Sequence, residues 1–166
     1  ETEIEFNLCK KPILSSAYKP NREFLDQYPN ADRFDIIKKE FIQAKPLFED
    51  KGYQTFDFVK LDIQGGELNA LKGLEKSLDN CLGMEIEVEF SEMYKSQPLF
   101  GDVHSFLSSK GFYFCDFINL YRWERDSHNG FGRCIFSDGL WMKDLKNLDS
   151  NKTEDYLKCA AICSIY

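Results

Sequence analysis

Residues 57–67 have the sequence Asp-Phe-Val-Lys-Leu-Asp-Ile-Gln-Gly-Gly-Glu, and a leucine-rich segment follows them. The β-branched and aromatic residues predict a strand over Phe58–Ile63, the glycine pair predicts a turn, and leucines spaced three or four residues apart predict a helix after it. Open α/β sheets bind their ligands just beyond the carboxyl ends of their strands. Asp62, Gln64 and Glu67 therefore lie where we expect a functional site.

Asp62 and Glu67, the two carboxylates near the turn, differ in how strongly the sequence favours a functional role. A carboxylate at a strand end can bind a metal, accept the proton of a substrate hydroxyl or orient an amine, and we favour such a role for Asp62 over a purely turn-forming one. Glu67 fits either a functional role or a structural one, because an acid in the first helical turn is stabilised by the helix dipole. The Gly65-Gly66 pair lets a ligand approach the backbone closely but is a weak signature for phosphate binding.

A second acidic pattern occupies Met84–Phe90, where Glu85, Glu87 and Glu89 alternate with apolar residues. The alternation places the three glutamates on one face of a strand. That face is either exposed to solvent or, if the strand is central and parallel, buried with partners or a cavity. Glu89 is nearest the strand end and is the glutamate that we expect to share a site with Asp62.

The following loop carries Tyr94 and Gln97, in the rim where substrate-binding side chains often lie. The two histidines are weaker candidates. His104 falls among apolar residues in a predicted helix, and His128 falls in a polar turn over residues 126–130. We interpret His104 as a structural or exposed residue rather than a catalytic base, and His128 as solvated. The cysteines offer no spacing typical of zinc ligands. No metal site is predicted.

The order of elements predicts an α/β fold with a mostly parallel sheet, right-handed crossovers and a terminal antiparallel hairpin. This order corresponds to half of a doubly wound fold. The expected elements are a strand over Glu3–Leu8, a short helix over Arg22–Tyr28, a strand within Arg33–Ala44, the strand Phe58–Ile63, a helix over Glu67–Leu78, a strand over Leu82–Phe90, a helix capped by Asp102 and stopped by Gly111, strands over Phe112–Trp123 and Arg133–Met142, and an amphipathic helix over Thr153–Tyr166.

Composition narrows the class of protein. The chain has 166 residues, a formal net charge of −7 and scattered lysines and arginines, which disfavours nucleic-acid and anionic-membrane partners. No apolar run approaches the ~20 residues that span a bilayer. Six cysteines without a CxxC pair predict buried free thiols and a cytoplasmic protein. The chain starts at Glu1 without methionine, and both ends interrupt a patterned segment, so we expect a piece of a larger protein.

Residues 57–67, together with Leu71-Lys72-Gly73, resemble the hallmark segment of FkbM-type methyltransferases. The resemblance extends over most of the chain. The other segments that match in order are Ser15-Ser16, Pro20-Asn21, Glu87–Phe90, Tyr94 with Gln97–Phe100, Gly111-Phe112 and Asp138–Trp141.

The resemblance implies a class I methyltransferase that uses S-adenosylmethionine and methylates a hydroxyl of a sugar or another small molecule. It implies that residues 1–166 are one truncated domain, the C-terminal half of a Rossmann-like sheet. Asp62 and Glu67 would be catalytic, and Glu89, Gln64 and Tyr94 would bind the acceptor.

The glycine-rich cofactor loop of that family is expected upstream of Glu1, since no GxGxxG occurs in this sequence. The cofactor-binding residues are therefore unknown, and the chain by itself is expected to be inactive. Two alternatives stay open: a non-catalytic α/β binding or interaction module, and a carbohydrate-binding domain that uses the aromatic loops. A sheet edge left free by missing strands could also pair copies of the chain into a homo-oligomer.

Overall fold

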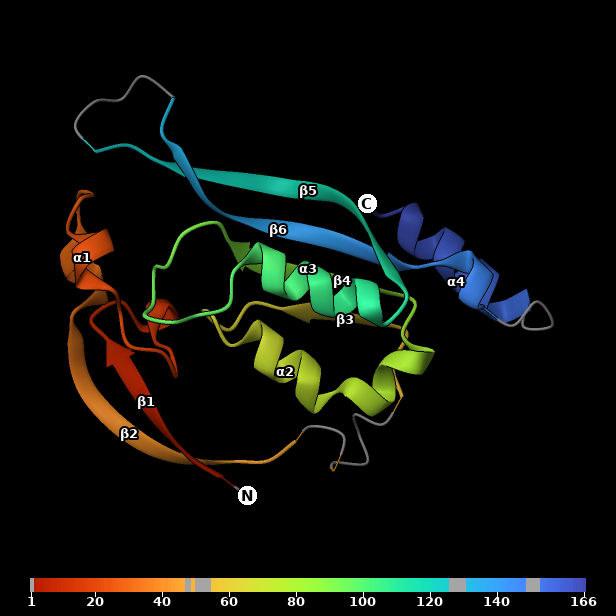
Figure 1. Cartoon of the computed structure of the whole chain (residues 1–166), viewed down its shortest axis with the longest axis horizontal. Helices are drawn as coiled ribbons and strands as arrows, with labels where there is room; N and C mark the ends of the chain where they lie inside the picture. Colours follow the sequence, from red (N-terminus) through yellow and green to blue (C-terminus); the bar gives the residue numbers. More distant parts are fainter. Residues whose placement is uncertain (1, 47–48, 50–54, 126–130, 149–152) are drawn as a thin grey trace.

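The computed structural model describes residues 2–46, 49, 55–125, 131–148 and 153–166. Figure 1 shows the arrangement of the elements. They are β1 (Thr2–Cys9), α1 (Arg22–Leu25), β2 (Ile36–Ala44), β3 (Phe58–Leu61), α2 (Glu67–Gly73), β4 (Gly83–Glu89), α3 (Phe100–Ser109), β5 (Phe112–Trp123), β6 (Arg133–Lys143) and α4 (Thr153–Cys163), with 3-10 turns at Pro12–Leu14, Ala31–Phe34, Glu75–Asn80 and Leu145–Asn147.

The main sheet has the strand order β3-β4-β6-β5. β3 and β4 are parallel, whereas β6 is antiparallel to both of its neighbours. β3, β4 and β5 thus share one direction, and β6 is the one reversed strand of this sheet. Three of the four strands share a direction, but the strand pairs are not mostly parallel as expected. β6 lies between β4 and β5, so two of the three ladders are antiparallel.

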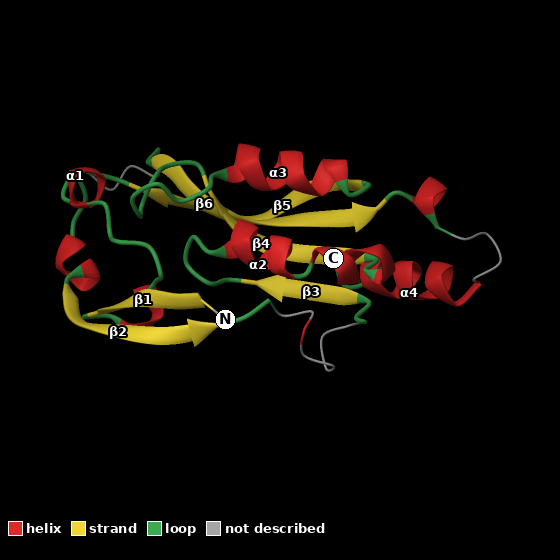
Figure 2. Ribbon diagram, turned by 60° about the horizontal axis from the view of Figure 1, so that its bottom comes forward, coloured by secondary structure: helices red, strands yellow, loops and turns green. Residues whose placement is uncertain are grey.

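β1 and β2 form a separate antiparallel ribbon, with Thr2 opposite Ala44 and a register shift near Cys9. Figure 2 shows the ribbon beyond the carboxyl-terminal end of β3. Most of its side chains are exposed, including the apolar Ile37 and Phe41. The ribbon therefore contributes little to the core, but the chain between its strands closes over the carboxyl ends of β3 and β4, where it lines a pocket.

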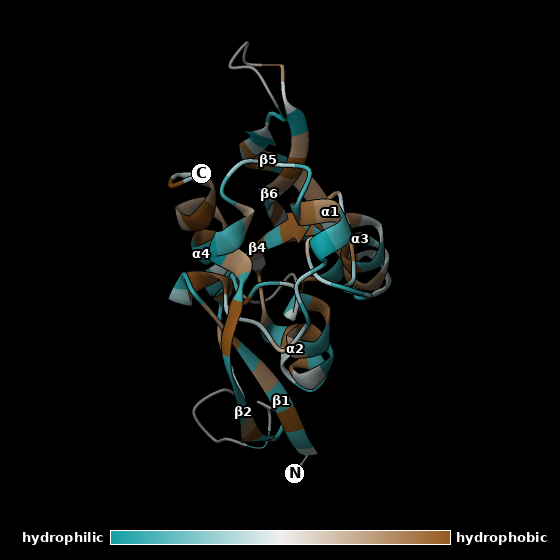
Figure 3. Cartoon of the chain, turned by 90° about the vertical axis from the view of Figure 1, so that its left-hand side faces the viewer, coloured by the Kyte–Doolittle hydropathy of each residue, from teal (hydrophilic) through white to brown (hydrophobic). Residues whose placement is uncertain are grey.

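The two faces of the main sheet are covered by different elements. α2 and α3 lie on one face and α4 on the other, as Figure 3 shows from the end of the sheet. The core under α2 and α3 includes Met84, Ile86 and Val88 of β4, packed against leucines of α2 and α3. A smaller cluster joins Cys159 of α4 to Leu82 and Met142.

The glutamates of β4 occupy the face opposite this core, and they are buried. Glu85, Glu87 and Glu89 are 8%, 6% and 1% exposed. Of the two interpretations of the alternating pattern, the exposed acidic face is wrong, because β3 and β6 flank the strand on both sides and β4 is buried along its length. Three acids thus stand on an interior face of the sheet.

Several boundaries differ from those expected. α3 begins at Phe100 rather than at Asp102. Asp102 is its third residue and accepts a hydrogen bond from the Leu99 amide at 2.9 Å, which caps the helix from inside its first turn. Gly111 stops the helix with φ of +80°, as expected. The helix expected over residues 67–78 leaves α geometry at Gly73 and continues as a 3-10 turn.

The cysteines agree with the predicted buried free thiols only in part. All six cysteines are free, but only Cys9, Cys81 and Cys159 are buried, whereas Cys115 and Cys163 are exposed. The turn expected over residues 126–130 lies outside the described residues. In the part of the chain that the structure describes, no helix is long and apolar enough to cross a membrane.

Candidate functional site

The loop after β3 has an unusual backbone. Gln64 has φ of +60° and Gly65 has φ of +94°, so two successive residues are left-handed. Glycine adopts this conformation without strain, but glutamine does so at a cost and needs support from its surroundings. The Ser16 hydroxyl supplies part of it by donating a hydrogen bond to the Gln64 carbonyl at 2.6 Å. The strained backbone directs the Gln64 side chain between β3 and β4.

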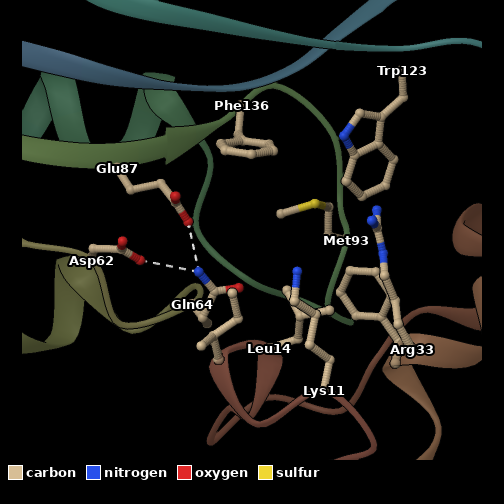
Figure 4. Close-up of a pocket in the computed structure, with 11 residues that line it drawn as sticks. Lys11, Leu14, Arg33, Asp62, Gln64, Glu87, Met93, Trp123 and Phe136 are labelled. Carbon is tan, nitrogen blue, oxygen red and sulfur yellow. Dashed lines mark hydrogen bonds between the residues drawn. The ribbon is translucent and has the colours of Figure 1, made fainter.

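Gln64 connects the polar groups of this corner. Its Nε2 donates to Asp62 Oδ1 at 3.0 Å and to Glu87 Oε1 at 2.9 Å (Figure 4). Its Oε1 lies 2.9 Å from the hydroxyl of the buried Tyr94, which lies equally near the carbonyl of Leu14. One amide thus fixes two carboxyl groups from adjacent strands, and Tyr94 fixes the amide.

Glu67 is the buried support of the same loop. It is 2% exposed, and its Oε1 accepts a hydrogen bond from the Ile63 amide at 2.7 Å. Burial raises the pKa of Glu67, against the opposing effect of hydrogen bonds from the loop backbone. Glu67 is not among the residues that line the pocket, and its hydrogen bond is to the loop backbone.

Glu87 and Glu89 have carboxyl groups that burial makes hard to ionise. Burial and the nearby charges of Asp62, Glu67 and Asp138 raise the pKa of Glu87 to about 8, despite the hydrogen bond from Gln64. Burial and the nearby charges of Glu67 and Glu87 raise the pKa of Glu89 well above its usual value. At neutral pH Glu87 is thus mainly a neutral acid that can donate a hydrogen bond.

The pocket beside this corner has a volume of about 490 Å³. Such a volume is typical of small-molecule sites. Its residues come from the chain between β1 and β2, from the loop after β3, from β4 and the loop behind it, and from β5 and β6; they are Lys11, Ile13, Leu14, Arg33, Phe34, Asp62, Gln64, Glu87, Met93, Trp123 and Phe136. In Figure 4, Asp62 and Glu87 lie on one side, Arg33 lies on the other, and Lys11 lies between Gln64 and Arg33.

The sequence-predicted residues divide into two layers around this pocket. Asp62 and Gln64 line it, whereas Glu67, Glu89 and Tyr94 lie behind the lining. Glu87 lines it in place of Glu89. The parallel register explains the exchange, because Leu61 pairs with Ile86, so that Asp62 is level with Glu87. The alternating pattern marked all three glutamates but carried no information about this register.

The remaining pocket residues were not found from the sequence. Lys11, Arg33, Trp123 and Phe136 are scattered over the chain, and no local pattern connects them. Among the described residues, no group of three or more histidine, cysteine or acidic side chains is arranged to bind a metal ion. His104 stacks on Phe100 with ring centroids 5.5 Å apart, away from the pocket.

An α/β sheet with a polar pocket at the carboxyl ends of two parallel strands defines a ligand-binding α/β protein. The family model described as the Methyltransferase FkbM domain matches residues 8–114, which is more than half of the chain. The chain therefore belongs to the FkbM methyltransferase family. No curated protein and no solved structure matches it.

Proposed function

We propose that the protein is a methyltransferase that uses S-adenosylmethionine to methylate a hydroxyl group of a small acceptor, such as a sugar, bound in the pocket beside Asp62. The observation that supports this most is the Asp62–Gln64–Glu87 group at the pocket wall. It combines a hydrogen-bond acceptor and a neutral acid within reach of one ligand, in a chain of a methyltransferase family.

The sheet supports the finer assignment of a class I, Rossmann-like half-sheet. Three strands share one direction, the reversed β6 lies between β4 and β5, and helices connect β3 to β4 and β4 to β5. β3 is an edge of the described sheet, so further parallel strands can add beside it. The free cysteines agree with a reducing compartment, which favours the cytoplasm.

The residues present fit the charged end of the cofactor. S-adenosylmethionine supplies an electrophilic methyl group on a sulfonium cation. Asp62 is exposed and forms no ion pair with any described residue, so its carboxylate can face such a cation. The sequence contains no GxGxxG loop, and we assign the nucleoside part of the cofactor to no residue of this chain.

The proposed roles follow from the hydrogen bonds. Asp62 accepts or orients the proton of the acceptor hydroxyl. Glu87, protonated at neutral pH, donates to an acceptor oxygen, and Gln64 keeps the two carboxyl groups in place. Glu67 and Tyr94 hold the loop and the amide, and Glu89 lies buried behind the pocket lining with Gln97 as its neighbour. Catalysis by such a group is mainly alignment of the hydroxyl with the methyl carbon.

The test is Asp62→Ala in the full-length protein that carries this chain. Release of S-adenosylhomocysteine is measured with a panel of sugars and hydroxy compounds, beside thermal unfolding of the same samples. We expect at least a ~100-fold loss of turnover with unchanged melting, the usual scale for a lost general base. Asp79→Ala, an exposed acid outside the pocket, is the matched control. Wild-type turnover in the Asp62 variant would contradict the assignment.

The same samples separate an enzyme from a non-catalytic binding module. Calorimetry with S-adenosylmethionine on the full-length protein should show saturable binding. If sugars bind but neither the cofactor binds nor methyl transfer occurs, the binding module is the better description.

A further inference from the structure

The pocket lining includes two cationic side chains, Lys11 and Arg33, and Figure 4 draws Arg33 on the side away from Asp62. The Lys11 amide donates a hydrogen bond to the Arg33 carbonyl at 3.0 Å, which holds the two residues side by side. They come from the chain that leaves β1 and from the 3-10 turn that precedes β2. The pairing of β1 with β2 therefore brings two cationic residues to one pocket.

Aromatic rings hold Arg33 in place, and no ion pair joins it to an acid among the described residues. Its guanidinium carbon lies 4.8 Å from the ring centre of Trp123 and 5.3 Å from that of Phe34. Its Nε is buried and has no hydrogen-bond partner. Aromatic stacking fixes the plane of a guanidinium while leaving its N–H edges free to donate. Within the described part of the chain, this Nε–H group is thus buried without an acceptor.

The two acids that flank Arg33 along the 3-10 turn are committed to other cations. Asp32 accepts from Lys10 at 2.6 Å, and Asp35 pairs with Arg22 at 3.0 Å. Within the described ranges, neither Lys11 nor Arg33 forms an ion pair. Two unpaired cations in one pocket stand out in a chain whose net charge is −7.

The acidic wall neutralises these cations only in part. Of its two carboxyl groups, Glu87 has a pKa of about 8 and is mostly protonated at pH 7, which leaves Asp62 as the charged one. The charged groups of the pocket lining therefore carry an excess of positive charge.

We propose that the acceptor is an anionic hydroxy compound whose phosphate or carboxylate group binds Lys11 and Arg33 while its hydroxyl lies at Asp62. Arginine binds both kinds of anion through paired N–H donors, and lysine adds a point charge. The hydroxyl end of this inference rests on the proposed function, whereas the anionic end rests on the cations themselves. A sugar phosphate or a sugar acid has the required pair of groups and fits a pocket of about 490 Å³.

The test measures binding to the intact chain without cofactor. Calorimetry compares glucose 6-phosphate, glucuronate, glucose and inorganic phosphate, and the fluorescence of Trp123, which contacts Arg33, gives a second signal. We expect at least one charged sugar to bind ten times or more as tightly as glucose and as inorganic phosphate. Preference for glucose 6-phosphate identifies a phosphate group on the acceptor, and preference for glucuronate identifies a carboxylate.

Substitutions then locate the preference. Lys11→Gln and Arg33→Gln should each reduce the affinity for the charged sugar about tenfold and leave that for glucose unchanged. Arg33→Lys should lose less affinity for the charged sugar than Arg33→Gln but should not reach the wild-type affinity. Lysine keeps the positive charge but lacks the paired N–H donors of the guanidinium. Lys72→Gln removes the same charge from an exposed position on α2 outside the pocket and should change nothing.

The proposal is overturned if no charged sugar binds more tightly than glucose, if inorganic phosphate alone binds as tightly as the charged sugar, or if the preference survives both substitutions. These outcomes are independent of methyl transfer. Loss of transfer in the Asp62 variant with charged-sugar binding intact supports both proposals, and absence of transfer in the wild type with binding intact overturns the function alone.

Discussion

The two faces of β4 are equally buried but chemically opposite. Met84, Ile86 and Val88 face the leucines of α2 and α3, whereas Glu85 and Glu87, between them in sequence, face the other side of the sheet. Burying the apolar side chains stabilises the fold, by about 1.5–3 kcal/mol for each large one. Burying acids costs free energy unless each has a partner. One strand thus provides both the core and the candidate site.

The acidic face itself divides into a paired part and an unpaired part. Burial acts to raise the pKa of Glu85, but hydrogen bonds from Lys60 and from the Tyr166 hydroxyl outweigh it, so the pKa is lower than usual. Two residues further along, Glu87 has the neutral Gln64 amide as its one hydrogen-bond partner among the described residues, and its pKa rises to about 8. The difference indicates a structural role where α4 ends and a functional one beside the pocket.

The largest effect is expected on the apolar face. Ile86→Ala should lower the free energy of unfolding by about 4 kcal/mol, since truncation of a fully buried isoleucine loses both transfer energy and packing. Urea unfolding at pH 7 measures it. Ile37→Ala, at an exposed position on β2, should change the stability little. Equal effects at the two positions would contradict the assignment of the core.

The second effect belongs to Glu87 and depends on pH. Because its pKa is higher in the folded chain than in the unfolded one, the folded state loses stability as pH rises from about 4.5 to about 8. At 1.4 kcal/mol per pKa unit, this group accounts for about 3 kcal/mol between pH 5 and pH 8. Glu87→Gln should abolish this loss of stability between pH 5 and pH 8 and make the protein more stable than wild type at pH 8.

Unfolding curves in urea at pH 5 and pH 8 provide the measurement. Glu92→Gln, at an exposed position in the loop after β4, should show the same change in the free energy of unfolding between pH 5 and pH 8 as the wild type. If Glu87→Gln also shows the wild-type change in stability between pH 5 and pH 8, the Glu87 carboxyl group ionises normally. The contrast between the two parts of the acidic face then disappears.

The smallest effect should come from Glu85, with the opposite sign. Its lowered pKa means that its ionised form stabilises the fold above the unfolded-state pKa, and that this contribution is lost as pH falls through the folded-state pKa. Glu85→Gln should therefore destabilise by about 1 kcal/mol at pH 7, the scale of a net hydrogen bond, and by nothing measurable near pH 2.5. A stabilising effect at pH 7 would place Glu85 with Glu87 as an unpaired acid.

Local patterns predicted the elements better than their assembly. β5 was expected over Phe112–Trp123 and has those bounds, because a long aromatic run begins right after a helix-stopping glycine. The helix after residue 66 was predicted too long, since evenly spaced leucines fit both the α-helix and the 3-10 turn that follows it. The insertion of β6 between β4 and β5 was not predicted, because strand order depends on contacts far apart in sequence.

The candidate site shows the same division. Asp62 and Gln64 were found because a strand, a turn and a helix are adjacent in sequence at residues 57–67. Glu87 was passed over for Glu89, and Lys11 and Arg33 were not considered, because their places in the pocket depend on strand register and on the β1–β2 ribbon.

The sequence by itself determined which residues share a face and where the chain must turn. Both follow from covalent geometry: alternate residues of a strand point to opposite sides, and the left-handed Gly65 accepts a φ that other residues resist. Only the tertiary structure decided which acids are buried, which are paired and which cations face them. Those properties depend on the solvent and charges that distant segments bring or remove, so three similar glutamates acquire different pKa values on one strand.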